Sequence, residues 1–517
     1  MSKDTSNWLI GLEKRFMARH DILHHIHSLL PLRAAARIAC VSKAFLNSWR
    51  CRPNLYISIK ALGLKENSIW VSRDFATQIH HILTKHSGIG LRTLHLSLYG
   101  CWYVGFCDLC SWLYLAITSG NGSSIEYLSL NSCAFHPTVG IGCMRSLKRL
   151  SLCFMSITKD ELGCLVSNSS ALERLELMCC NEITWLKIPC LMLRLSYLEV
   201  LQCKRLQVIE SEAPILSSLA HVHSHYVQLS LGEASQLKNL AICCPCAVSY
   251  AGAKFPIILP NLESLTICST IEVLSAPTVP STFLHLKYLD IRHPVPEFEA
   301  SHHDYFSLAS FFDASPSLET FILRIHVIEK PYPYKNWELA WRSTACFPED
   351  PPHLRRLPEH HDKLKRAKIV GFLPAMSLLE LACYVVETAT SLECLTLDTS
   401  HECDSHYDDP ECHYNTSHDC HDYLLDFRKY MEGKVPAAAR SANIVLSFRD
   451  KGIRDVALPP WHCDGMAVAL RHATIRVDTA DTRALPASRG HKHGWRPLVS
   501  DLSLPAPNSP LPSPSPS

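Results

Sequence analysis

One short phrase, Leu-x-x-Leu-x-Leu with occasional Ile, Val or Phe, recurs through most of the chain. Successive copies mostly stand about 22 to 25 residues apart, and such a period indicates a solenoid. The last two aliphatic positions alternate as they do in a β-strand. The copies are Leu91/Leu94/Leu96, Ile125/Leu128/Leu130, Leu147/Leu150/Leu152, Leu172/Leu175/Leu177, Leu195/Leu198/Val200, Leu237/Leu240/Ile242, Leu262/Leu265/Ile267, Leu286/Leu289/Ile291, Leu318/Phe321/Leu323 and Leu392/Leu395/Leu397. Each repeat is therefore expected to supply one strand and to pack on its two neighbours.

Both the period and the phrase are those of leucine-rich repeats. The aliphatic positions are expected to form the core, whereas the residues between them, such as Thr93, Tyr127 and Arg149, are expected to face outward. The charge of these outward residues changes from repeat to repeat, which indicates no single ligand class. Because a solenoid presents an extended surface and does little chemistry, the sequence favours a binding function.

Composition and apolar runs limit which partners and which cellular compartment we expect for this chain. The chain has 517 residues and a formal net charge of +1, so no overall field favours nucleic acid or an anionic membrane. No run of 18 or more apolar residues is present, and the apolar residues 8–10 are too few for the core of a signal peptide. We therefore expect a soluble protein of the cytoplasm, the nucleus or both, with no nucleic-acid or membrane partner.

The interpretation of the 24 cysteines depends on the expected compartment. In a reducing compartment they are expected to stay thiols. Cys133, Cys180 and Cys203 each follow the last aliphatic strand residue of a repeat by three positions, where leucine-rich repeats carry an inward Asn or Cys. We expect these side chains to pack as small apolar groups.

Residues 21–50 carry three short apolar stripes at helical spacing. Pro31 separates the first stripe from the second, and Ser42 is a good N-cap for the third. The helical residues expected to offer an apolar surface to a partner are Ile22, Leu23, Ile26, Leu29, Leu30, Pro31, Leu32, Val41, Ser42, Phe45 and Trp49. A unit this small is only marginally stable alone, so we expect a partner to complete it.

This segment resembles the F-box of plant F-box/leucine-rich-repeat proteins. The matching residues are Ile22-Leu23, Leu30-Pro31-Leu32, Val41-Ser42-Lys43 and Trp49-Arg50. The resemblance implies docking on a Skp-type adaptor and, through it, on cullin. The chain departs from the family at Ala18-Arg19, where a Leu-Pro pair is usual.

A second resemblance covers the end of the repeats. The segment 364–398, with a helical stripe at Leu378, Leu381, Val385 and Val386, is similar to the FBD module that closes many such proteins. The sequence around Phe427 fits the end of the same pattern. Residues 505–517 are rich in Pro and Ser, a composition that cannot bury enough apolar surface to fold.

The expected fold class is α/β: an N-terminal three-helix F-box-like unit followed by a leucine-rich repeat solenoid and a disordered C-terminal tail. The expected boundaries are residues 1–16 for a flexible N-terminus, 17–58 for the F-box-like unit, 59–90 for a cap, 91–362 for the repeats, 363–437 for the FBD-like module and 438–517 for the tail.

Sites of chemistry are not expected. The most metal-like cluster is His401, Cys403, His406, Cys412, His413, His418, Cys420 and His421. It contains no Cys-x-x-Cys pair, and its spacings match no zinc module. A polar loop explains it better, so we expect no metal, no cofactor and no catalytic residue.

Two functional interpretations follow. The first is a non-catalytic substrate-recognition subunit of an SCF-type (Skp-cullin-F-box) ubiquitin ligase, with the repeats binding a target protein. The second, suggested by Ala18-Arg19, is a repeat-based interaction scaffold that has lost adaptor binding.

Overall fold

The structure is a computed structural model of the whole chain. It describes residues 25, 27–64, 71–86, 91–99, 106–118, 125–135, 144–223, 225–232, 236–270, 272–274, 281–296, 303–328, 360–372, 375–398 and 443–447. The chain divides into two units, residues 1–451 and 452–517. All described residues belong to the first.

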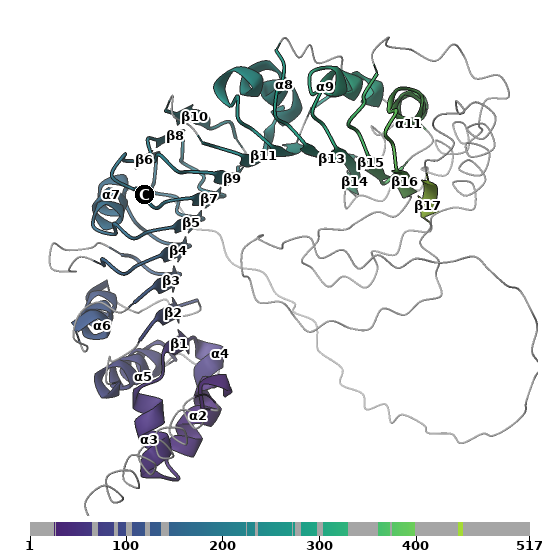
Figure 1. Cartoon of the computed structure of the whole chain (residues 1–517). Coiled ribbons are helices and arrows are strands. Elements are labelled where there is room, and N and C mark those ends of the chain that lie inside the picture. Colours follow the sequence, from purple (N-terminus) through teal and green to yellow (C-terminus); the bar gives the residue numbers. More distant parts are fainter. Residues whose placement is uncertain are drawn as a thin grey trace, which may run out of the picture. The chain divides into compact units, whose positions relative to one another are not determined.

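The main feature of the first unit is a parallel sheet of 14 strands, each hydrogen-bonded to its neighbours in nearly sequential order (Figure 1). Its strands are β1 (Asn54–Ile57), β2 (Thr93–Ser97), β3 (Tyr127–Asn131), β4 (Arg149–Cys153), β5 (Arg174–Met178), β7 (Tyr197–Leu201), β9 (Ser218–Val222), β11 (Asn239–Pro245), β12 (Ser264–Thr270), β13 (Tyr288–Pro296), β14 (Thr320–Ile328), β15 (Arg366–Val370), β16 (Cys394–Asp398) and β17 (Asn443–Ser447). The parallel sheet with one strand per repeat confirms the repeat prediction.

One side of this sheet is filled by the phrase residues. Leu94, Leu128, Leu150, Leu175 and Leu265 are all at most 1% exposed. The register explains why they stack, because each pairs with its equivalent on the next strand, as Leu150 does with Leu175. Burying each of these side chains contributes roughly 1.5–3 kcal/mol, so the array is held together mainly by its leucine ladders.

Helices return the chain between many of the strands and lie on the same side of the sheet (Figure 1). Their buried residues belong to the same hydrophobic core as the strand leucines. The helices are α5 (Val71–Lys85), α6 (Phe106–Thr118), α7 (Lys159–Ser167), α8 (Ala247–Ile258), the 3-10 helix η2 (Tyr305–Leu308), α9 (Ala309–Asp313) and α11 (Met376–Thr388). Helix α7 begins with a capping box: Thr158 Oγ1 accepts from the Glu161 amide, and the Thr158 amide donates to the Glu161 carboxylate. Such a cap supplies hydrogen-bond acceptors for backbone amides at the start of the helix, which have no acceptor within the helix.

Three repeats use short strands in place of these helices. Strands β6 (Trp185–Ile188), β8 (Val208–Ser211) and β10 (Gln228–Leu231) form a second parallel sheet. This second sheet is not predicted by the sequence, because each strand has only four residues and lies between copies of the phrase.

The N-terminal helical unit contains α2 (Leu32–Ala39) and α3 (Lys43–Arg50), followed by the one-turn helix α4 (Ile59–Leu62). Of the expected first helix, only residues 25 and 27–30 are described, and all of these except Leu30 are helical. Ser42 caps α3 as predicted, since its hydroxyl accepts from the Phe45 amide at 3.3 Å.

Arg52 joins this helical unit to the repeats. Its guanidinium donates to the carbonyls of His27, Ser28 and Leu30 at 3.2, 3.1 and 2.6 Å. Its Nε donates to the Asn54 carbonyl, at the start of β1, at 3.0 Å. Only 6% of Arg52 is exposed, so one buried cation satisfies the end of the first helical segment and fixes it against the first strand.

Several expected boundaries need correction. The sheet begins at β1, inside the segment 17–58 assigned to the helical unit, and α5 therefore lies within the first repeat instead of capping it. The sheet also continues to β17, which pairs with β16, although residues 438–517 were expected to be a disordered tail. Ile444 and Leu446 on β17 stand opposite Leu395 and Leu397, so the aliphatic alternation reaches further than the repeat phrase indicates.

The segment expected to be FBD-like contributes two strands to the end of the main sheet. Strand β15, helix α11 and strand β16 occupy the segment expected to be FBD-like, and they continue the main sheet without a break. The expected helix is present, with Leu378, Leu381, Val385 and Val386 at most 1% exposed. The later part of that segment, residues 399–437, lies outside the described residues.

Candidate functional site

The side chains that point away from the leucine core form what we call the open face of the main sheet. On β5 these are Arg174, Glu176 and Met178, and each stands in register with its equivalents on β4 and β7. The open face therefore consists of rows that run across the strands. Any partner that lies across the repeats meets one row residue about every 4.8 Å.

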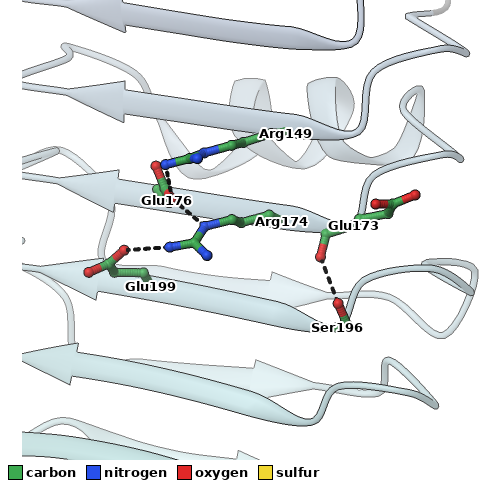
Figure 2. A network of polar contacts seen from close by, with 6 residues as sticks. All are labelled: Arg149, Glu173, Arg174, Glu176, Ser196 and Glu199. Carbon is green, nitrogen blue, oxygen red and sulfur yellow. Dashed lines mark hydrogen bonds and ion pairs between the residues drawn. The ribbon is translucent and has the colours of Figure 1, made fainter. Parts of the chain in front are cut away.

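A network of four charged side chains occupies the open face over β4, β5 and β7 (Figure 2). Arg149 Nη2 lies 2.7 Å from Glu176 Oε1, and Arg174 Nε donates to the same oxygen. Arg174 Nη2 lies 3.7 Å from Glu199 Oε2, and the Arg174 guanidinium carbon stands 3.6 Å from the centre of the Tyr197 ring. Two cations and two carboxylates thus neutralise one another over three adjacent strands.

Burial shapes the electrostatics of this network. The pKa of Glu199 is raised, first by desolvation and then by repulsion from Glu176, and Arg174 offsets only part of this. Burial and the charge of Glu199 raise the pKa of the Tyr197 hydroxyl to about 12. Arg149 is the accessible member, because 44% of its side chain is exposed. A partner carboxylate can therefore approach Arg149 most easily.

Beside the network runs a row of apolar and thiol side chains. It contains Cys153, Met178, Leu201, Val222, Cys243 and Cys268, which pair strand by strand from β4 to β12. This row and the charged network together give the open face one apolar and one charged stripe.

A second ionic cluster lies on β13 and β14. Arg324 Nε donates to Asp290 Oδ1 at 3.2 Å, and Arg292 Nε lies 3.8 Å from Asp290 Oδ2. Burial raises the pKa of the neighbouring Tyr288, and Asp290 adds to that effect. The open face thus carries an arginine–carboxylate cluster beside a tyrosine in two separate places.

The structure places the predicted adaptor-binding residues unequally. Leu29 and Val41 are 71% and 78% exposed, and Pro31 and Ser42 are exposed as well. Leu30, Phe45 and Trp49 are half-buried. Ile22, Leu23 and Ile26 lie outside the described residues.

Leu32 does not lie on the surface of the helical unit as predicted. Only 7% of it is exposed, and its side chain packs in the hydrophobic core. It follows Pro31 at the first position of α2, where the helix turns this side chain inward.

The expectation for the cysteines is confirmed for two of the three residues named. Cys180 and Cys203 are fully buried, and Cys133 is half-buried against the same core. Within the described ranges, no group of three or more His, Cys, Asp or Glu side chains is arranged to hold a metal ion. The cluster from His401 to His421 lies outside those ranges.

A buried histidine pair at the end of β9 was missed: His221 lies on the strand and His223 follows it directly. His221 and His223 are at most 2% exposed, their Nδ1 atoms lie 3.4 Å apart, and burial lowers the pKa of His221 to about 3 and that of His223 to about 4. The signal was present in the sequence: Leu216, Leu219 and His221 form a copy of the phrase in which histidine replaces the last aliphatic residue.

The comparison with known families agrees with this architecture. Residues 118–443 match the leucine-rich repeat domain of the plant At1g61320/AtMIF1 family, which is more than half of the chain. The chain belongs to this family. No curated protein matches it. Within the part of the chain that the structure describes, no helix is both long and apolar enough to cross a membrane.

Proposed function

We propose that this leucine-rich repeat protein is a non-catalytic substrate-recognition subunit of an SCF-type ubiquitin ligase. The N-terminal helical unit docks on a Skp-type adaptor and thereby on cullin, while the open face holds a target protein. Its contribution to ubiquitin transfer is proximity, so no residue of this chain touches the reacting bond. Such a complex works in the cytoplasm, the nucleus or both.

The observation that carries the proposal is the exposure of large aliphatic side chains on a very small unit. Leu29 and Val41 lie mostly in water, at 71% and 78% exposure, although the repeats next to them bury nearly every leucine of the phrase. A partner that covers them gains roughly 1.5–3 kcal/mol for each side chain. The resemblance of residues 21–50 to an F-box supports a Skp-type adaptor as that partner.

The open face supports the second half of the proposal. Arg149 and Glu176 can exchange their mutual ion pair for pairs with a target, and Met178 and Val222 offer apolar contact beside them. Such mixed surfaces favour specificity and fast association over raw affinity.

The test is binding of the full chain to a purified Skp-type adaptor. Leu29→Asp and Val41→Asp should each weaken binding at least tenfold, because each removes one covered aliphatic group and adds a charge. Ile257→Asp is the matched control, since Ile257 is 64% exposed on α8, away from the helical unit, and this variant should bind normally.

Positions 18 and 19 separate this proposal from the alternative. Replacing Ala18 and Arg19 by the family's Leu-Pro pair should tighten adaptor binding. If neither the natural chain nor this variant binds an adaptor, the scaffold interpretation replaces the ligase one.

A further inference from the structure

Along the edge of the main sheet where the strands begin, one residue per repeat forms what we call the edge ladder. The backbone amide of each member donates to the carbonyl of the member before it, as Lys148 does to Glu126 at 2.8 Å. The members are Arg92, Glu126, Lys148, Glu173, Ser196, Ser217, Lys238, Glu263, Lys287, Glu319, Lys365 and Glu393. Apart from the two serines, the charges alternate in sign from one repeat to the next.

The alternation produces ion pairs between neighbouring repeats. Lys148 Nζ lies 3.0 Å from Glu126 Oε2, and Lys365 Nζ lies 3.3 Å from Glu319 Oε2. Glu263 forms two ion pairs, with Lys238 Nζ at 3.0 Å and Lys287 Nζ at 3.1 Å. Exposed pairs of this kind contribute little stability, at most about 1 kcal/mol each. A ladder of alternating charge does, however, cover the edge with paired polar groups.

The ladder is interrupted at Ser196 and Ser217, which precede β7 and β9. Their hydroxyls donate to backbone carbonyls, Ser196 to Glu173 at 3.3 Å and Ser217 to Ser196 at 3.1 Å. Glu173 therefore has no cation at the next position. Its carboxylate points away from the arginine network (Figure 2), and among the described residues it has no ion pair.

The same two repeats place aliphatic side chains in water at this edge. Leu193 and Ile215, in the turns that lead into β7 and β9, are 64% and 45% exposed, and Leu191 is 72% exposed. The Leu193 amide donates to the Leu191 carbonyl at 2.9 Å, which keeps both in one turn. Several equivalent turns hold no large aliphatic side chain: Arg145–Ser146, Ser170–Ala171, Pro260–Asn261, Pro316–Ser317, Asp362–Lys363 and Thr390–Ser391. The turn before β13 holds one exposed leucine, Leu284.

The two turns that hold these apolar side chains belong to neighbouring strands. Strands β7 and β9 are direct neighbours, with Tyr197 opposite Ser218, so their leading turns are separated by about one strand spacing of 4.8 Å. The break in the ladder is thus an apolar surface with the Glu173 carboxylate at its border, which has no ion pair among the described residues and interacts at longer range with Lys148 of the preceding repeat.

We propose that Leu191, Leu193 and Ile215 form a docking site for a segment of another protein that carries two aliphatic side chains next to a lysine or arginine. The aliphatic side chains cover the exposed leucines and isoleucine, and the cation pairs with Glu173. This site is separate from the helical unit and from the open face, so the proposal does not depend on adaptor binding.

The test uses fluorescent twelve-residue peptides and the full chain, with binding followed by anisotropy. One peptide carries Leu-x-Leu flanked by lysines, and its partner carries the same pair flanked by glutamates. The lysine peptide should bind more tightly. Leu193→Ser together with Ile215→Ser should weaken it about tenfold or more, because two covered aliphatic groups are lost.

Two variants make the test selective. Glu173→Lys should reverse the preference, so that the glutamate peptide now binds more tightly. Leu284→Ser is the matched control, since Leu284 is 58% exposed in the equivalent turn before β13, where the ladder pair of Lys287 and Glu263 is intact. This control should leave peptide binding unchanged.

Three results would overturn the proposal: no binding of either peptide, equal losses in the Leu193/Ile215 and Leu284 variants, or an unaltered preference after Glu173→Lys. Concentration-dependent self-association of the chain that disappears in the Leu193/Ile215 variant would assign the surface to a second copy instead.

Discussion

The repeat array and the N-terminal helical unit differ in what they do with large aliphatic side chains. In the array, Leu150, Leu175 and Leu198 are fully buried between neighbouring repeats, whereas Leu29 and Val41 of the helical unit lie mostly in water. The array completes its own core, because every inner repeat has two neighbours. Among the described residues, the helical unit contacts only one end of the array, where Arg52 fixes it. Where a region cannot cover its own apolar surface, binding is the expected purpose.

The largest expected effect tests the completeness of the array. Leu175→Asp places a charge without a partner between β4 and β7, which should cost on the order of 4 kcal/mol or more and unfold neighbouring repeats together. Thermal denaturation followed by circular dichroism measures this. Ser129→Asp, on the open face of β3 and opposite His95 and Ser151, is the control and should change the melting temperature only slightly. Equal effects of the two variants would mean that the two faces of the sheet are not as assigned.

The next effect tests the connection between the two regions. Arg52→Ala removes a buried cation together with its four hydrogen bonds. Three backbone carbonyls of the helical unit then lose their donor. The local cost should be about 3 kcal/mol, so limited proteolysis should cut within α2 and α3 while the repeats stay intact. Arg37→Ala, at an exposed position of α2, is the control. Unchanged cleavage in the Arg52 variant would show that the helical unit holds its place without this residue.

A smaller effect is the pH dependence of the stability of the array, which arises from the buried His221. Burial lowers the pKa of His221 to about 3 from an ordinary value of 6.5. Below pH 6.5 the unfolded chain takes up a proton that the folded chain does not, so stability falls as the solution is acidified. At pH 5 this histidine should cost about 2 kcal/mol relative to pH 7.

His221→Leu restores the aliphatic phrase and should remove that part of the pH dependence, while substitution of His81, an exposed histidine on α5, should not. Denaturant titrations at pH 7 and pH 5 compare the variants. A His221→Leu chain that loses as much stability at pH 5 as the natural chain would contradict the account.

The smallest effect lies in the helical unit. Ser42→Ala removes the hydroxyl that accepts from the Phe45 amide, which should cost about 1 kcal/mol of α3 stability. Amide exchange within Lys43–Arg50 should accelerate by roughly fivefold in consequence. Asn47→Ala, in the middle of the same helix, serves as the control. Equal exchange in both variants would show that the cap is not made in solution.

The sequence was sufficient for the part of the fold that repeats. The phrase located the buried leucines and implied a parallel sheet, because a period of this length leaves room for a return segment between strands. It missed β9, where His221 stands at a core position, and β1, where Leu55 and Ile57 follow Pro53 without a leading leucine. Periodicity detects only repeats that keep their aliphatic residues.

The candidate sites were much less predictable. Arg149, Glu176 and Glu199 come from three different repeats, and only the register of the strands shows that they meet. The same holds for the edge ladder, whose break at Ser196 and Ser217 is visible only when the repeats are aligned. Contacts between repeats depend on the register of the strands, and the composition of the chain does not reveal that register.

The most direct test of the difference between the two regions is hydrogen–deuterium exchange of the full chain with and without a Skp-type adaptor. The account predicts slower exchange within α2 and α3 on adaptor binding and unchanged exchange in β5 and β7. Unchanged exchange in the helices, or slower exchange confined to β5 and β7, would contradict the assignment of the helical unit as the adaptor-docking region.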